Sequence, residues 1–190
     1  MESTVPIEAA PALDAAAPLA ERLSAAEFAV FYERVAPRLR GYLRAQTGDP
    51  SVADDLLQET FARVLASRFA PESDEHFVRY LYRAAGNLLA DRARAAFRAP
   101  APLEDAPEPA IDPPPPGLRR DLGRAFAALA PRERRLLWLA HVEGLDHREI
   151  GETVGVRAAS VRVLLFRARR RLAALLDRAP AGAVVSGSES

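Results

Sequence analysis

Residues 143–176 read EGLDHREIGETVGVRAASVRVLLFRARRRLAALL, and this stretch decides the fold of the C-terminal part of the chain. Its first half predicts an amphipathic helix over 147–154 that ends at Gly155, a residue able to adopt the left-handed backbone of a tight turn. Its second half predicts a longer helix over 158–177, with apolar residues at helical spacing. Two helices joined in this way are typical of a helix-turn-helix, whose second helix enters the major groove of DNA.

The charges of the second helix indicate the same partner. From Ala158 to Leu176 it has five arginines and no acidic residue, and Arg157 precedes it. A solvated helix face normally mixes both signs of charge, so a face of one sign indicates an anionic partner. The pattern therefore favours DNA, whose phosphates attract arginine, over a merely solvated surface.

The charge of the whole chain hides this basic segment. The 190 residues carry 26 Lys+Arg and 26 Asp+Glu, and every one of these cations is an arginine. Residues 118–178 hold fourteen arginines and seven acidic residues, a net charge of +7, while 28–98 carry +2. Residues 1–27 and 99–117 carry −4 each, and 179–190 carry −1. A net charge of zero therefore does not exclude nucleic acid as a partner.

A proline-rich segment divides the chain into two domains. Residues 99–117 hold eight of the sixteen prolines and four acidic residues, which predicts an extended, semi-rigid acidic linker. The linker separates a domain over 27–98 from a domain over 118–178. Residues 1–26, rich in Ala, Pro and acid, are expected to form a disordered arm, and 179–190 a disordered tail.

Neither domain shows the alternating pattern of strands, so the expected fold class is all-α. In the first domain, apolar residues recur at helical spacing in three runs that begin at Phe28, Leu57 and Phe77. Asp49 and Ser51 are both candidates to cap the second run, and 70–73 separate it from the third. In the second domain, with Pro131 in a first turn, helices are expected over 118–129, 132–142, 147–154 and 158–177.

Residues suited to catalysis or to metal binding are not grouped anywhere in the sequence. Cys is absent, the three His (76, 141 and 147) are scattered, and no Gly-rich phosphate loop occurs. No apolar run approaches the roughly 18 residues of a membrane span. We therefore expect no enzyme activity, no cofactor, metal or small-molecule substrate, no membrane insertion, and a cytoplasmic location.

Both domains resemble the extracytoplasmic-function (ECF) sigma factors of bacterial RNA polymerase. The motifs similar to region four are Glu143-Gly144-Leu145, Glu149-Ile150-Gly151, Gly155-Val156, Ser160-Val161-Arg162 and 165–172. The motifs similar to region two are Asp49-Pro50, 53–61 and 80–91. The resemblance covers about 28–98 and 118–176. It implies a region-two bundle and a region-four helix-turn-helix, in a factor that binds core polymerase and directs promoter recognition, DNA melting and transcription initiation.

The resemblance implies three groups of binding residues. A polar, mostly acidic helix face would dock on the clamp helices of the largest polymerase subunit: Asp54, Asp55, Gln58 and Glu59. The minus-ten element would be melted and read by Arg79, Tyr80, Arg83, Asn87, Asp91 and Arg94, with the loop 67–76 capturing an unstacked base. The minus-thirty-five element would be contacted by Arg157, Ser160, Arg162 and Arg167.

The resemblance implies further contacts outside these groups. The polymerase flap and an anti-sigma factor are expected partners, and the acidic linker is expected to thread through the RNA exit channel. The aromatic residues Phe77, Tyr80 and Tyr82 lie among arginines, a composition suited to a separated DNA strand. Helical spacing puts Phe77 and Leu81 on one face, so some of these rings are expected in the core instead.

The second helix of the helix-turn-helix departs from the family pattern at three positions. Val163-Leu164 stand where relatives usually carry a small polar and a basic residue, and Phe166 stands where His or another polar residue is usual. The lost basic position allows an unusual minus-thirty-five sequence or a lower DNA affinity. Two alternative functions therefore stay open: a sigma-like decoy for an anti-sigma factor, and a helix-turn-helix repressor. The repressor would leave the 54–59 helix and the acidic linker without a purpose.

Overall fold

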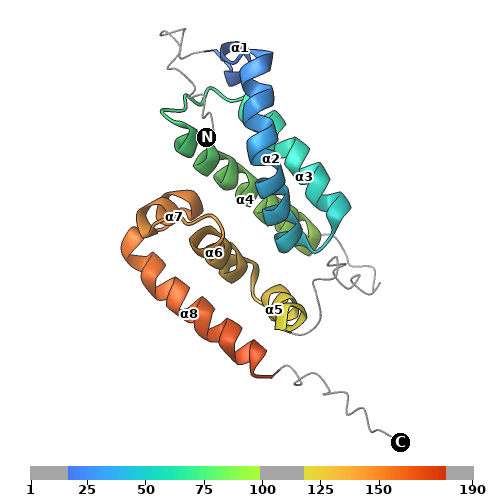
Figure 1. Cartoon of the computed structure of the whole chain (residues 1–190), viewed down its shortest axis with the longest axis vertical. Helices are drawn as coiled ribbons and strands as arrows, with labels where there is room; N and C mark the ends of the chain where they lie inside the picture. The colour runs from blue at the N-terminus through green and yellow to red at the C-terminus, as the bar shows by residue number, and fades with distance from the viewer. Residues whose placement is uncertain (1–16, 99–117, 179–190) are drawn as a thin grey trace, which may run out of the picture.

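The computed structural model describes residues 17–98 and 118–178, where all regular structure is α-helical, which confirms the predicted fold class. The predicted linker, the predicted tail and residues 1–16 of the predicted arm lie outside the described residues. Figure 1 shows that the helices form two groups. The N-terminal domain contains α1 (Leu19–Arg22), α2 (Ala25–Thr47), α3 (Pro50–Leu65) and α4 (Asp74–Arg98). The C-terminal domain contains α5 (Leu118–Ala127), α6 (Pro131–His141), α7 (His147–Val154) and α8 (Ala158–Leu176).

Helices α2, α3 and α4 form a bundle around the apolar residues that recur at helical spacing. The rings of Phe31 and Phe77 stack at its centre, with centroids 4.1 Å apart, and Tyr42 meets Tyr82 edge to face at 5.1 Å. Phe77 and Tyr82 are therefore core residues rather than rings available to a separated DNA strand. Burial raises the pKa of the Tyr82 hydroxyl well above its ordinary value, with the Glu143 carboxylate adding to this effect.

The turn between α2 and α3 resolves the choice between the two candidate caps. One carboxylate oxygen of Asp49 accepts hydrogen bonds from the main-chain N–H groups of Ser51 (2.8 Å) and Val52 (3.2 Å). Pro50 takes the first helical position, where a missing N–H costs nothing. Asp49 is thus the cap of α3, and Ser51 is simply part of its first turn.

The prediction of a disordered arm is wrong for its last ten residues. Residues 19–22 form α1, and Leu19 is buried in the core of the N-terminal domain. The main-chain N–H of Leu19 donates to Ser67 O (2.8 Å), and Arg22 Nη1 donates to Phe69 O (3.4 Å). A single buried leucine with two hydrogen bonds orders this turn against the loop after α3. Such an anchor barely alters the overall composition, so an argument from composition misses it.

The four helices of the C-terminal domain agree with the predicted ranges to within two residues. Pro131 opens α6, as expected. Gly155 ends α7 with φ 73° and ψ 40°, the left-handed conformation that the sequence predicted. The predicted helix-turn-helix of α7 and α8 is therefore confirmed.

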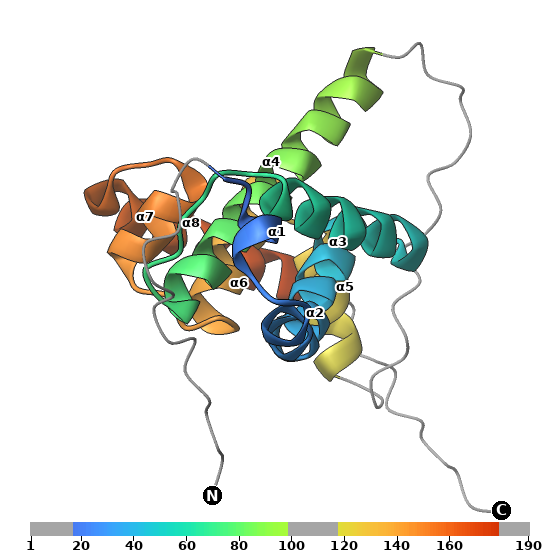
Figure 2. The ribbon, with the colours of Figure 1, turned by 90° about the horizontal axis from the view of Figure 1, so that it is seen from above.

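The two domains pack directly against each other, which the sequence did not predict. Helix α6 contacts α2, and α7 contacts α4. The ring of Trp138 lies edge to face with Tyr42, and the buried apolar residues of both domains form one continuous cluster. Figure 2 shows α7 beside the first half of α4, whose last turns extend beyond the other helices.

We expect Leu81→Ala to destabilise the N-terminal bundle, because Leu81 is fully buried in α4 and its loss leaves a cavity. The free energy of unfolding should fall by about 2–5 kcal/mol. Hydrogen exchange of the α2 and α3 main-chain amides measures this loss. Val30→Ala, at an exposed position of α2, is the control and should change stability by no more than about 0.5 kcal/mol. Equal protection in the two variants would contradict this packing.

Candidate nucleic-acid interface

The start of α7 is built around two carboxylates that cap each other's main chain. Asp146 Oδ1 accepts from the N–H of Glu149 (2.8 Å), and Glu149 Oε2 accepts from the N–H of Asp146 (3.0 Å). The hydrogen bond from Glu149 lowers the pKa of Asp146 below its ordinary value. Further along α7, a Cβ on Gly151 would lie 2.7 Å from Val156 O, so only glycine allows this approach of the turn. These contacts position α8 relative to α7.

Helix α8 turns one side to the core and the other to solvent. Val161, Leu165 and Ala168 are buried. The four residues predicted to contact the minus-thirty-five element are all exposed and lie at or near the beginning of the helix: Arg157, Ser160, Arg162 and Arg167. All four side chains are therefore accessible around the end of α8 that a helix-turn-helix directs toward base edges.

The residues predicted to read the minus-ten element follow one side of α4. Arg79, Arg83, Asn87 and Asp91 are spaced by four residues, and Arg94 follows three residues later. All except Arg79 are exposed. Asp91 is paired with Arg94 and lies 3.9 Å from Nη1 of Arg63 on α3. The second half of this side is thus accessible, with its one carboxylate already paired to arginine.

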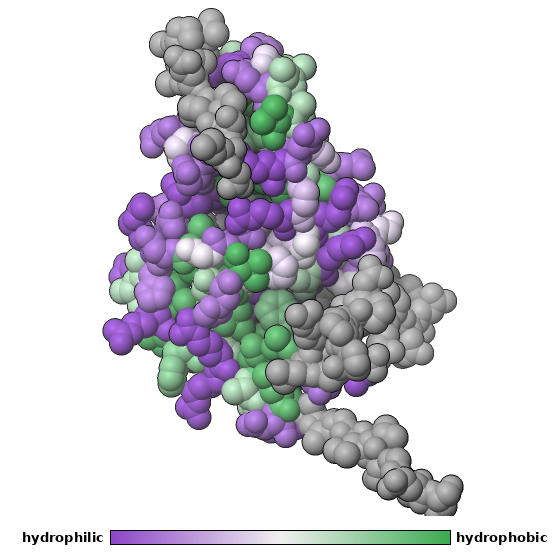
Figure 3. Space-filling model, in the orientation of Figure 1, coloured by the Kyte–Doolittle hydropathy of each residue, from purple (hydrophilic) through white to green (hydrophobic). Residues whose placement is uncertain are grey.

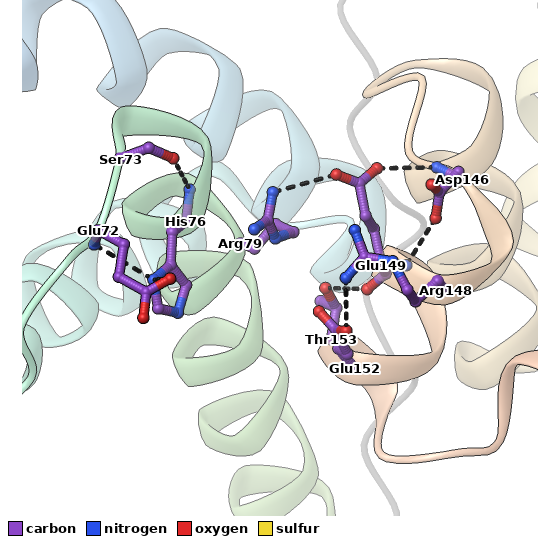
Figure 4. Close-up of polar contacts among 9 residues, drawn as sticks. All are labelled: Glu72, Ser73, His76, Arg79, Asp146, Arg148, Glu149, Glu152 and Thr153. Atoms are coloured by element: carbon purple, nitrogen blue, oxygen red, sulfur yellow. Dashed lines mark hydrogen bonds and ion pairs between the residues drawn. The ribbon is translucent and has the colours of Figure 1, made fainter.

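The first half of the same side of α4 is occupied by other parts of the chain. Arg79 Nη1 donates to Glu149 Oε1 of α7 at 3.0 Å, and only 19% of the Arg79 side chain is exposed. Figure 4 shows Arg79 pointing from α4 toward the capped start of α7. The Tyr80 ring stacks on Phe69 of the preceding loop, with centroids 3.8 Å apart. Two of the six predicted minus-ten residues are therefore engaged within the protein.

The acidic face of α3 lies on the outside of the N-terminal domain. Asp55, Gln58 and Glu59 are exposed, and Asp54 is half-exposed. Asp54 Oδ1 forms an ion pair with Arg40 Nε of α2 at 2.8 Å, and Glu59 Oε1 accepts a hydrogen bond from Arg63 at 2.6 Å. The structure brings the four predicted residues together, but arginine partners reduce the negative charge that the sequence alone indicates.

Polar residues at the boundary between the domains make contacts that the sequence did not indicate. Glu143, with 2% of its side chain exposed, accepts from Arg38 Nη2 of α2 (2.6 Å) and from Trp138 Nε1 (3.0 Å). Arg134 Nη2 donates to Gln46 O at the end of α2 (2.9 Å). Burial lowers the pKa of the Arg134 guanidinium.

Arg135 enters the boundary where α4 has no side chain. Its Nη2 donates to Thr153 O (2.9 Å) and to Tyr82 O of α4 (3.4 Å). A Cβ placed on Gly86 would lie 2.1 Å from the Arg135 guanidinium carbon. A glycine inside a predicted helix usually marks a place where another group packs closely. Gly86 was therefore the signal in the sequence for this contact with Arg135.

Within 17–98 and 118–178, no group of three or more His, Cys, Asp or Glu is placed to hold a metal ion. Among the helices of these two ranges, none combines the length and the hydropathy needed to cross a membrane.

Comparison with protein families and with curated proteins extends these observations. Residues 31–98 match Sigma-70 region 2, and residues 119–172 match Sigma-70, region 4. RNA polymerase sigma factor CarQ of Myxococcus xanthus is 34% identical over 154 residues, which cover 78% of this chain and 88% of CarQ. ECF RNA polymerase sigma factor SigF of Caulobacter vibrioides is 35% identical over 145 residues, which cover 75% of this chain and 81% of SigF.

Solved structures share the fold of this chain. The sigma factor RpoE in complex with the anti-sigma factor NepR, from Bartonella quintana, matches with a TM-score of 0.64 and 22% identity, over 80% of this chain and 98% of RpoE. CnrH in complex with the cytosolic domain of CnrY matches with a TM-score of 0.61 and 20% identity, over 83% and 92% of the two chains. Since both sigma regions match in order and two sigma factors are more than 30% identical over most of their length, the chain belongs to the ECF sigma factors of bacterial RNA polymerase.

Proposed function

We propose that this sigma factor binds core RNA polymerase through the α3 face, reads and melts the minus-ten element with α4, and binds the minus-thirty-five element with α8. Its partners are the clamp helices and flap of the polymerase, and promoter DNA. It recruits and positions, and carries out no chemistry of its own. The observation that carries this proposal is the exposed first half of α8, where arginines occur with no acidic residue.

The charges of the three surfaces suit three different targets. Region 4, which includes α8, carries a net charge of +7 over 118–178, as expected for duplex DNA. The exposed part of α4 combines arginines with Asn87, a side chain that can hydrogen-bond to base edges. The α3 face carries three carboxylates, Asp54, Asp55 and Glu59, suited to a basic protein surface.

Anti-sigma factors are a further class of partner in this proposal. RpoE of Bartonella quintana was solved with an anti-sigma factor, and CnrH with the cytosolic domain of CnrY. These proteins share the fold of this chain, so a surface suited to such a partner is compatible with it. The same partner would bind a sigma-like decoy, and transcription separates a sigma factor from a decoy.

Run-off transcription with purified core polymerase tests the proposal. With promoters taken from a genome-wide selection, the wild-type chain should produce transcripts. Asp55→Arg combined with Glu59→Arg should lower the affinity for core about tenfold, because two attractive charges become repulsive. Glu33→Arg, at an exposed position of α2, is the matched control and should transcribe normally. Core binding without a transcript from any promoter would favour the decoy, and operator binding without core would favour the repressor.

Arg162→Ala should weaken binding to a duplex that carries the minus-thirty-five element. If Arg162 neutralises one phosphate, the slope of log affinity against log salt should become less steep by about 1. Binding of the full chain, measured between about 50 and 200 mM salt, gives the slope. A slope equal to that of the wild-type chain would remove Arg162 from the phosphate contacts.

The packed arrangement of the two domains does not suit both promoter elements at once. The minus-ten and minus-thirty-five elements lie about 25 base pairs apart, or about 85 Å of straight duplex at about 3.4 Å per pair. Here Arg79 of α4 is in direct contact with Glu149 of α7, the helix adjoining α8. The proposed function therefore includes a separation of regions 2 and 4, which releases Arg79 for DNA.

Gly86→Ala should favour the separated arrangement, because a Cβ would displace the Arg135 guanidinium from the carbonyls of Tyr82 and Thr153 that it links. Gly41→Ala is a matched control, since its Cβ would lie at an ordinary 3.7 Å from the Trp138 ring. Both substitutions raise helix propensity by about 1 kcal/mol, so this effect cancels. The chain has no Cys, and spin labels on Val30→Cys and Val142→Cys can report the interdomain distance. The distance should lengthen only with Gly86→Ala, and unchanged distances in both variants would contradict this role of Arg135.

A further inference from the structure

Two large apolar residues are exposed on the solvent side of α8. Val163 is 49% exposed and Phe166 is 58% exposed. At about 100° per residue, both lie opposite the buried Val161, Leu165 and Ala168. We call Val163 and Phe166 the apolar strip. Figure 3 shows apolar patches over the half of the molecule formed by α5–α8, on the face turned to the viewer.

The apolar strip is enclosed by arginines. Arg162 and Arg167 lie on its two sides, since they fall about 40° and 100° in opposite directions from Phe166 around the helix. One turn further along, the Arg170 guanidinium lies over the Phe166 ring, 5.9 Å from its centroid. Single exposed apolar residues are common on protein surfaces, but this pair lies in the middle of the arginine-rich, acid-free face of α8.

The arrangement matches the cross-section of a major groove. Arginines at the two sides of a helix can reach the phosphates on both walls, and the middle of the helix then faces the base edges. The base edges in the major groove carry hydrogen-bonding groups, and one apolar group, the 5-methyl of thymine. An apolar residue in the middle of such a helix gains contact only where a thymine presents this methyl.

We propose that Val163 and Phe166 select thymine at positions of the minus-thirty-five element by packing against its methyl group. This inference rests on the proposed binding of that element by α8. The apolar strip is thus a surface for thymine-containing duplex DNA. Charge complementarity between the flanking arginines and the phosphates favours DNA over an apolar protein surface. Arg170 acts as a positioning residue that holds the Phe166 ring along the helix axis.

Replacement of thymine by deoxyuridine removes only the methyl group and tests the inference. A duplex site is first selected from random sequence with the full chain assembled on core polymerase, and each thymine is then replaced singly. The wild-type holoenzyme should lose about fourfold in affinity at one or two positions, the equivalent of about 0.8 kcal/mol for one buried methyl. The other thymines should tolerate the replacement.

Variants of the apolar strip test whether its side chains cause the preference for thymine over deoxyuridine. With Val163→Ala or Phe166→Ala, thymine and deoxyuridine should bind equally at the position that the replaced side chain reads. Val142→Ala makes the same substitution at a residue that is 56% exposed and lies just after α6, and it should keep the discrimination. Arg170→Ala should reduce the discrimination at the position read by Phe166, without a change in core binding.

Several outcomes would overturn the inference. Equal binding of thymine and deoxyuridine by the wild-type holoenzyme at every position, with specific DNA binding intact, would overturn it and leave the proposed function standing. Loss of core or anti-sigma binding in Val163→Ala or Phe166→Ala, with DNA binding unchanged, would assign the strip to a protein partner instead. Failure to select any specific duplex would overturn both the inference and the proposed contact of α8 with DNA.

Discussion

Two adjacent arginines of α6 link the two domains of this sigma factor, in the packed arrangement that also covers Arg79 of α4 with the start of α7. Arg134 donates to Ala127 O and Gln46 O, and Arg135 donates to Thr153 O and Tyr82 O, so that each links its own domain to the other. Three of these carbonyls lie in the last turn of a helix, where they lack a partner in the helix itself and carry the negative end of its dipole. A guanidinium can reach two carbonyls at once, whereas the ammonium of lysine is a single point of charge.

The helices could be predicted from the sequence, but the packing of the domains could not. Apolar periodicity identifies which side of a helix is buried, and glycine and proline mark its ends, so the ranges in region 4 and the turn at Gly155 were predicted correctly. Periodicity does not identify the partner of that side. The Arg38–Glu143 pair joins residues 105 positions apart, and nothing local to either residue indicates the other.

The same holds for the candidate site, where features of one helix could be predicted and contacts between the domains could not. The position of Arg157, Ser160, Arg162 and Arg167 around the beginning of α8 follows from the predicted helix, and in the structure all four are exposed. Of the aromatic residues beside the predicted minus-ten group, only burial decides which belong to the core, and Phe77 and Tyr82 do. The engagement of Arg79 by Glu149 depends on the packing of two domains and lies beyond any argument from one helix. The roles of these residues toward DNA and polymerase remain predictions.

The two carboxylate oxygens of Glu149 make different contacts, one within α7 and one to the other domain. This affects how readily the domains can separate. Oε2 accepts from the main chain at the start of α7, while Oε1 accepts from Arg79 of region 2. Loss of the Arg79 contact leaves the first turn of α7 capped. In the proposed separation of regions 2 and 4, no helix would have to melt and re-form, so the transition would be rapid and reversible, and α8 would meet DNA already folded.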